Sequence, residues 1–167
     1  LPVNEIEAHI ASSSFLNAAL VLRLLSNAHP QVCEELQDAV TALQTGNIAI
    51  VMGGKESTTA EARAAMLAEK TNGKCVILTE NEIPINTFSH SRFVKMANDA
   101  AQENETAFIV DPLTSLILAR GKIETILLWG KHLKQLSSAL NGNEFDGTRI
   151  VSSAVTASME KKRIWKE

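Results

Sequence analysis

The sequence predicts an α/β fold in which a small, mostly parallel sheet of about three to five strands is flanked by helices and preceded by an N-terminal helical pair. Two observations predict it. Short apolar runs alternate with helical patterns from residue 46 onward, and turn residues separate them. Apolar residues make up 45% of the 167 residues, enough for the core of one ordinary domain. We therefore expect a single domain over 1–167, helical over 1–45 and βα-alternating over 46–167.

The first part of the chain has helical periodicity. Apolar residues recur at near-helical spacing between positions 6 and 25. The serines at 12–14 interrupt this face, so a break or a kink is expected there. A second helix is expected to start at Pro30 and to end at Gly46, because proline suits a first turn and glycine a helix end.

Three short apolar runs predict buried strands. Residues 47–52 and 74–79 are too short for helices, and they end at Gly53 and at a polar loop over 80–89. Residues 107–110 form the third run. Continuous apolar runs of this length are typical of strands that are covered on both faces.

Helices are expected between these strands. An alanine-rich helix should run over 60–70, with a serine or threonine at 57–59 as its cap, and another over 91–102. Asp111 followed by Pro112 is a strong signal for a third helix start.

The C-terminal third leaves one choice open. Residues 123–129 are either a fourth strand followed by a helix over 131–140 or part of one long helix. The preceding βα alternation favours the strand. Residues 149–157 can form a final strand or a helix, and the basic residues in 161–166 are expected on an exposed helix.

Composition narrows the classes of partner. A net charge of −3 and an aromatic content of 4%, with no tyrosine, do not favour nucleic acid. No apolar run approaches the roughly 18 residues of a membrane span. Two cysteines allow at most one disulfide, so the compartment stays open with a slight preference for the cytoplasm. The chain begins with Leu1, which leads us to expect a processed product or a domain of a larger protein.

The best candidate binding site is the glycine-rich turn after the first predicted strand. Glycines allow a ligand to approach the backbone, and the amide groups at a helix start attract a phosphate or carboxylate. The pattern matches neither a P-loop nor a dinucleotide fingerprint, and an ordinary capped turn also explains it. The residues assigned to ligand binding here are Gly53, Gly54, Lys55, Ser57 and Thr58.

A second candidate lies after residues 74–79, near the start of the next helix. His90 can act as a general acid or base, Arg92 can hold an anion, and Ser89 supplies a hydroxyl. A serine cap on a solvated helix is the alternative interpretation.

Carboxylates complete the predicted site. Asp111 and Glu56 are assigned to catalysis with His90, although the helix start alone explains Asp111. Glu80 and Glu82 lie on a loop of the same predicted edge. A magnesium site that includes Asp111 is conceivable, but no spacing selects it, no zinc spacing occurs, and no cofactor is singled out.

These features favour a small enzyme that binds a phosphorylated or nucleotide-like ligand at the carboxyl ends of the strands. Hydrolysis and group transfer are both compatible with them. The alternatives are a non-catalytic protein-interaction module, with an oligomer or protein partner, and an effector or toxin domain of a larger protein. The predicted site requires that three loops meet at one edge of the sheet.

Overall fold

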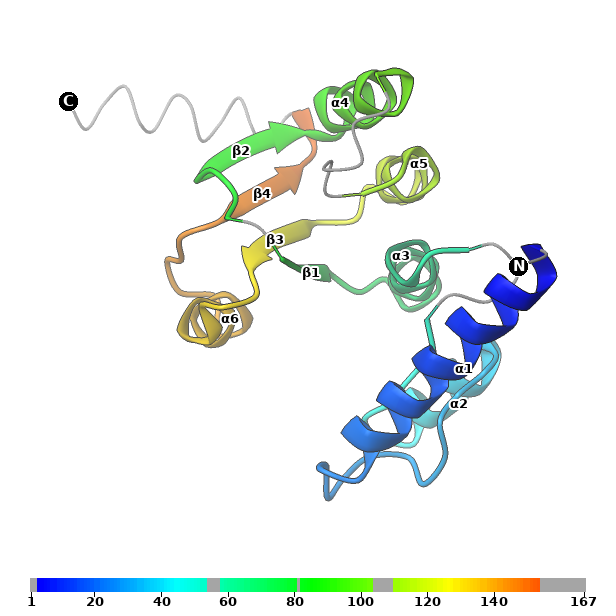
Figure 1. Ribbon diagram of the computed structural model, residues 1–167. Helices are drawn as coiled ribbons and strands as arrows, with labels where there is room; N and C mark the ends of the chain where they lie inside the picture. The colour runs from blue at the N-terminus through cyan, green and yellow to red at the C-terminus, as the bar shows by residue number, and fades with distance from the viewer. Residues whose placement is uncertain (1–2, 54–57, 81, 104–109, 154–167) are drawn as a thin grey trace. The chain divides into compact units, whose positions relative to one another are not determined.

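The computed structural model describes residues 3–53, 58–80, 82–103 and 110–153 (Figure 1). The chain forms a mixed α/β structure and divides into two compact units, Leu1–Thr71 and Asn72–Glu167. The boundary falls after α3 and not between residues 45 and 46, so the first apolar run belongs with the N-terminal helices. The single domain expected from the sequence stays a prediction.

The first helix, α1, runs without interruption from Val3 to Leu22. The break that was expected at residues 12–14 is therefore wrong. Serine costs a helix interior only about 0.5 kcal/mol relative to alanine, so three serines do not have to end a helix.

The second helix, α2, covers Leu36–Gln44 and begins six positions later than the sequence suggested. The segment after Pro30 is not helical, because it pairs with the first apolar run instead. Parallel bridges join Ala28 to Ile48 and Cys33 to Val51. The run at 47–52 is thus extended, but it forms isolated bridges and not the strand of a covered sheet.

The helix α3, Ala60–Thr71, begins where the sequence predicted, and the side chain of Thr59 accepts the amide of Ala62 at 3.1 Å. The core of this unit joins α2, α3 and the two bridged segments through small and branched apolar side chains. Its members are Cys33, Ala39, Ala42, Ala49, Val51 and Leu67.

The second unit contains a four-stranded sheet in the order β1-β3-β4-β2. Its strands are β1 (Cys75–Thr79), β2 (Asn86–Ser89), β3 (Thr125–Trp129) and β4 (Thr148–Val151). The pairs β1–β3 and β2–β4 are parallel, whereas β3 and β4 are antiparallel. The strand preference for 123–129 is confirmed. The short polar strand β2 lies inside the stretch that was expected to be a loop.

The strand register assigns side chains to the two faces of the sheet. Leu127 pairs with Ile77 and with Thr148, so these three share one face, whereas Ile126 and Arg149 share the other. β3 is central and buried along most of its length, with Leu128 fully covered. The helix α6, Leu133–Leu140, contributes Leu136 and Ala139 to a cluster with Ile126 and Leu128.

Two further helices, α4 (His90–Gln102) and α5 (Pro112–Arg120), pack against each other. Figure 1 shows them on the side of the sheet opposite to α6. Asp111 accepts the amide of Thr114, which is the predicted cap of α5, and Ser89 accepts the amide of Arg92, in line with the alternative interpretation of the second cluster.

Some predicted segments lie outside the described residues. These are most of the run at 107–110, the end of the segment 149–157, and the basic residues of 161–166. Within the described part of the chain, no helix is both long and apolar enough to cross a membrane.

Candidate functional site at the carboxyl ends of β1 and β3

The direction of the strands defines two different edges of the sheet. β1 and β3 are parallel and in register, with Thr79 opposite Trp129, so both strands end at the same level. β2 and β4 run the other way, because β4 is antiparallel to β3. Ligands of α/β sheets bind beyond the carboxyl ends of parallel strands, which makes the edge after Thr79 and Trp129 a candidate site.

A tight turn follows β3 at this edge. The amide of Gly130 donates to the carbonyl oxygen of Thr79 at 2.9 Å, and the Thr79 hydroxyl donates to the carbonyl of Leu128 at 3.1 Å. A Cβ atom on residue 130 would lie 3.2 Å from the Thr79 oxygen, so glycine allows the close approach of the two strand ends. One backbone and one side-chain hydrogen bond therefore hold the two strand ends together.

The indole of Trp129 is the largest side chain of the edge. Its Nε1 atom donates to the carbonyl oxygen of Glu80 at 3.0 Å, which ties the loop after β1 to the end of β3. The ring of His132 meets the indole edge-on, with centroids 4.6 Å apart and an interplanar angle of 61°. The Lys131 ammonium lies 5.5 Å from the indole centroid.

The same edge carries positive charge at the start of α6. His132 precedes the first residue of α6, and Lys131 and Lys134 are exposed beside it. The first amide groups of a helix have no partner within the helix and carry a partial positive charge. An exposed ammonium, an imidazole and these amides can together bind the phosphate of a ligand whose apolar part contacts Trp129.

The glycine-rich turn that the sequence singled out is in the first unit. Gly54, Lys55, Glu56 and Ser57 lie outside the described residues. Gly53 is in close contact with the start of α3, because a Cβ there would lie 2.6 Å from Cβ of Ala60. Thr58 precedes Thr59, the residue that caps α3. The described part of this turn is thus a capped helix start.

The second predicted cluster follows β2, not β1. Ser89, His90 and Arg92 therefore lie at the carboxyl end of β2, opposite to the edge that carries Glu80. The expectation that one edge holds both sets of residues is wrong. The missed strand β2 reverses the chain direction between them.

Local contacts engage the polar groups of this second cluster. The His90 ring is buried, and its Nε2 atom donates to the carbonyl oxygen of Ile123 at 2.9 Å. The guanidinium of Arg92 stacks 4.8 Å from the centroid of the Phe88 ring. A role of His90 in acid–base chemistry stays a prediction, and its described contact joins α4 to the segment before β3.

Asp111 lies at the other end of α5 from this contact. Its two carboxylate oxygens accept the amide and the hydroxyl of Thr114, at 2.9 and 2.7 Å. Ile123 contacts the C-terminal end of α5 through the carbonyl of Leu118. The nine residues of α5 span about 13 Å, which separates Asp111 from His90. The structure does not bring these two predicted catalytic residues together.

Sequence reasoning assigned no role to Trp129, Lys131 or His132. The signal that identifies them is their position directly after a predicted strand, which is the criterion that selected the other loops. Among the described residues no group of three metal-binding side chains occurs.

No family model matches the chain. Its sequence is 26% identical over 152 residues to a uridylate kinase of Methanothrix thermoacetophila, covering 82% of this chain and 68% of that protein. A uridylate kinase of Halobacterium salinarum is 25% identical over 160 residues, covering 86% of this chain and 66% of its own length. The chain thus spans about two thirds of the length of these curated relatives.

Solved structures give the same similarity. The uridylate kinase of Archaeoglobus fulgidus superimposes with a TM-score of 0.71 at 19% identity, over 84% of this chain and 69% of that one. The UMP kinase of Bacillus anthracis gives 0.63 at 13% identity, over 86% and 67%. The chain has a fold similar to that of uridylate kinase. Kinases are group transferases, so hydrolysis, one of the two reaction classes expected from the sequence, finds no support.

Proposed function

We propose that this chain is a nucleotide-binding phosphotransferase that acts on a nucleoside monophosphate, with UMP as the first candidate. The observation that carries the proposal is the 26% identity to a uridylate kinase over 82% of the chain, together with the similar fold. The relatives' name states that they phosphorylate uridylate. The nucleotide-like ligand expected from the sequence belongs to the same chemical class.

The chemistry of phosphoryl transfer fits the groups that the sequence and the structure offer. Such a reaction depends on positioning and on stabilising the charge of the phosphate oxygens, with little other chemistry left to the protein. The glycine-rich segment with Lys55 stays a proposed phosphate contact on the sequence alone. The edge after Trp129 can supply Lys131, His132 and the amides of α6.

Mg²⁺ usually accompanies nucleotide phosphates and is held by one or two carboxylates, with the phosphates and water as the other ligands. Glu80 is the carboxylate directly after β1 at the edge described above. The residues at this edge fit such an ion, because Mg²⁺ bound to a nucleotide needs only one or two protein carboxylates. The ion, when bound, would screen the charge of the phosphate oxygens.

The test is to incubate the purified chain with ATP and each of UMP, CMP, AMP and GMP, and to separate the nucleotides by ion-exchange chromatography. Formation of a nucleoside diphosphate from UMP is expected. Binding of ATP and of UMP is measured separately by calorimetry, so that a chain that binds without turnover is recognised. Absence of binding of both nucleotides would reject the proposal.

The edge is tested with Lys131→Ala, His132→Ala and the double variant. Both side chains are exposed, so their removal should leave the fold intact. Loss of one exposed charge contact to a phosphate is expected to weaken ATP binding about fivefold to tenfold. Lys95→Ala is the matched control, because Lys95 is an exposed lysine of α4 on the other side of the sheet. Equal affinities in all four proteins would exclude this edge as the ATP site.

A further inference from the structure

A cavity of about 470 Å³ lies between α6, the loop before β4, and β4 itself. Its lining consists of Gln135, Ser138, Glu144, Phe145, Asp146 and Arg149. We propose that this cavity binds a small zwitterion, a free α-amino acid, whose carboxylate contacts Arg149 and whose ammonium group contacts Asp146 and Glu144. The site is independent of the proposed kinase activity.

The charged side chains that line this cavity do not form ion pairs with one another in the described part of the chain. Arg149 forms its ion pair with Glu124, at 3.4 Å, which lies outside the lining. Within the described part of the chain, no ion pair joins Arg149 to either Asp146 or Glu144. A ligand that carries both charges can satisfy the guanidinium and the carboxylates at the same time.

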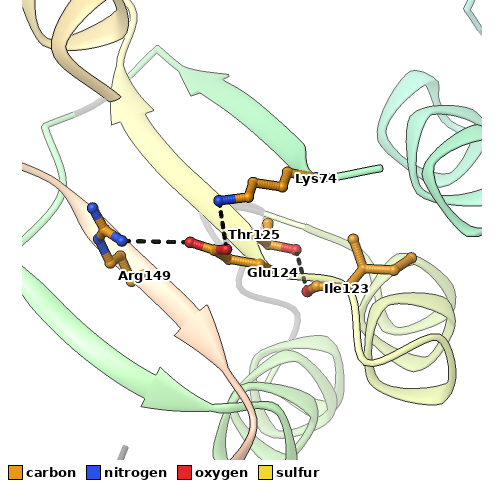
Figure 2. A network of polar contacts seen from close by, with 5 residues as sticks. All are labelled: Lys74, Ile123, Glu124, Thr125 and Arg149. Carbon is orange, nitrogen blue, oxygen red and sulfur yellow. Dashed lines mark hydrogen bonds and ion pairs between the residues drawn. The ribbon is translucent and has the colours of Figure 1, made fainter. Parts of the chain in front are cut away.

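Glu124 does not fully neutralise Arg149, the one cation in the lining of the cavity. Figure 2 shows that the Glu124 carboxylate lies between two cations, with one oxygen 2.8 Å from the Lys74 ammonium and the other 3.4 Å from Arg149. One carboxylate therefore serves two positive charges. A guanidinium has five N–H donors, so Arg149 keeps donors for the two oxygens of a ligand carboxylate.

Arg149 is also held in one orientation. Its guanidinium carbon lies 4.5 Å from the centroid of the Phe145 ring, and Phe145 packs against the core cluster of Ile126 and Leu128. A planar guanidinium stacked on a fixed ring loses little further entropy when it binds a carboxylate.

Two hydrogen bonds to Gln135 orient Asp146, a carboxylate in the lining, and leave one of its oxygens for a ligand. The Gln135 amide donates to Oδ2 of Asp146 at 2.8 Å, and its oxygen accepts the Asp146 backbone amide at 2.9 Å. These contacts orient the carboxylate and leave Oδ1 for a ligand. Gly147, next in the chain, lies so close to β3 that a Cβ would stand 2.6 Å from the Leu127 oxygen, which fixes the end of the loop.

Two further groups of the lining are available. The Glu144 carboxylate and the Ser138 hydroxyl take no side-chain hydrogen bond or ion pair from the residues that the structure describes. Both can contact an ammonium group or a polar side chain of the ligand. With two carboxylates and one guanidinium in the lining, a ligand with an additional positive charge is favoured.

The test is to follow the amide resonances of the ¹⁵N-labelled full chain by NMR while L-lysine, L-glutamine, 1,5-diaminopentane or Nα-acetyl-L-lysine is added. Saturable shifts of residues 135–149 are expected with L-lysine, and at least tenfold weaker binding is expected for L-glutamine. Diaminopentane lacks the carboxylate and the acetylated compound lacks the α-ammonium, so both should bind at least tenfold more weakly than L-lysine. Equal binding of either one, or no saturable shift with L-lysine, would overturn the proposal.

Two variants test the assignment of the lining without disturbing the fold. Glu144→Gln and Ser138→Ala change groups that have no described structural contact, and each should weaken L-lysine binding several-fold. Glu103→Gln, an exposed glutamate at the end of α4, is the matched control and should bind as the unmodified chain does. Unchanged affinity in both cavity variants would show that the ligand binds elsewhere.

Discussion

The Nε2 atom of His90 lies 2.9 Å from the carbonyl oxygen of Ile123, which also accepts the hydroxyl of Thr125 at 3.1 Å. One buried backbone oxygen thus receives two donors, from the start of α4 and from β3. Because a carbonyl oxygen only accepts, His90 carries its proton on Nε2 in this contact. Three elements of the second unit meet here, α4, α5 and β3, since Ile123 also follows α5 and precedes β3.

We expect His90→Ala to lower the free energy of unfolding by about 1–3 kcal/mol, because it removes a buried hydrogen bond and the packing of the ring. His90→Gln keeps a donor and should lose about half as much. Urea unfolding followed by circular dichroism measures both. A His90→Ala protein of unchanged stability that lacks a phosphotransferase activity found in the unmodified chain would instead support the catalytic role predicted from the sequence.

Asp111 offers a comparable test at the opposite end of α5. Asp111→Ala removes the two carboxylate contacts that accept the amide and the hydroxyl of Thr114, a fully buried residue. The expected loss of stability is about 1–2 kcal/mol for the cap. Asp111→Asn retains an acceptor and should lose less. Thermal unfolding of the two variants measures the difference. Equal melting temperatures for Asp111→Ala and Asp111→Asn would contradict the capping role.

The starts of α3 and α5 could be predicted because local chemistry sets them. Asp111 with Pro112 and the threonine before α3 each satisfy amide groups within their own turn, so nearby sequence contains the whole signal. The strand at 125–129 could be predicted for a similar reason, since its apolar run is buried on both faces.

The strand β2 could not be predicted in the same way. It has four residues, and only Phe88 among them is buried. Its pairing with β4 depends on residues about 60 positions away in the chain, which no local pattern records. The prediction for residues 47–52 was wrong for a different reason. Hydrophobicity predicted an extended segment there, but it did not predict that the segment pairs with residues 28–33.

Because β2 was not predicted, the predicted position of the site was also wrong. Without β2 the loop at 80–89 leads directly to His90, and both appear at one edge of a parallel sheet. With β2 the chain crosses to the other edge first. Trp129 is then the partner of Glu80, through a contact that depends on the register of β1 and β3, and Lys131 lies over the Trp129 ring.

Gly147 should tolerate no larger residue. In Gly147→Ala the new methyl group would lie 2.6 Å from the Leu127 oxygen and 2.7 Å from Cδ2 of Leu128, so β3 or the loop must shift. We expect a loss of about 3 kcal/mol. Gly142→Ala is the control, since nothing lies within 4 Å of its position and only the positive φ of 73° opposes alanine, at about 1 kcal/mol. Urea unfolding should separate the two variants, and equal losses would contradict the close approach of Gly147 to β3.

Burial raises the pKa of the Cys33 thiol above its usual value of 9.0, and the nearby charge of Asp38 raises it further. The unfolded chain therefore releases this proton at a lower pH than the folded protein. As pH rises above 9.0, ionisation stabilises only the unfolded state, and the free energy of unfolding falls until the folded thiol also ionises. The Cys33→Ala variant lacks this thiol but keeps every other titratable group of the protein. The stability difference between the unmodified protein and Cys33→Ala should shrink between pH 7 and pH 10 in urea unfolding, and a constant difference would show that the folded thiol titrates normally.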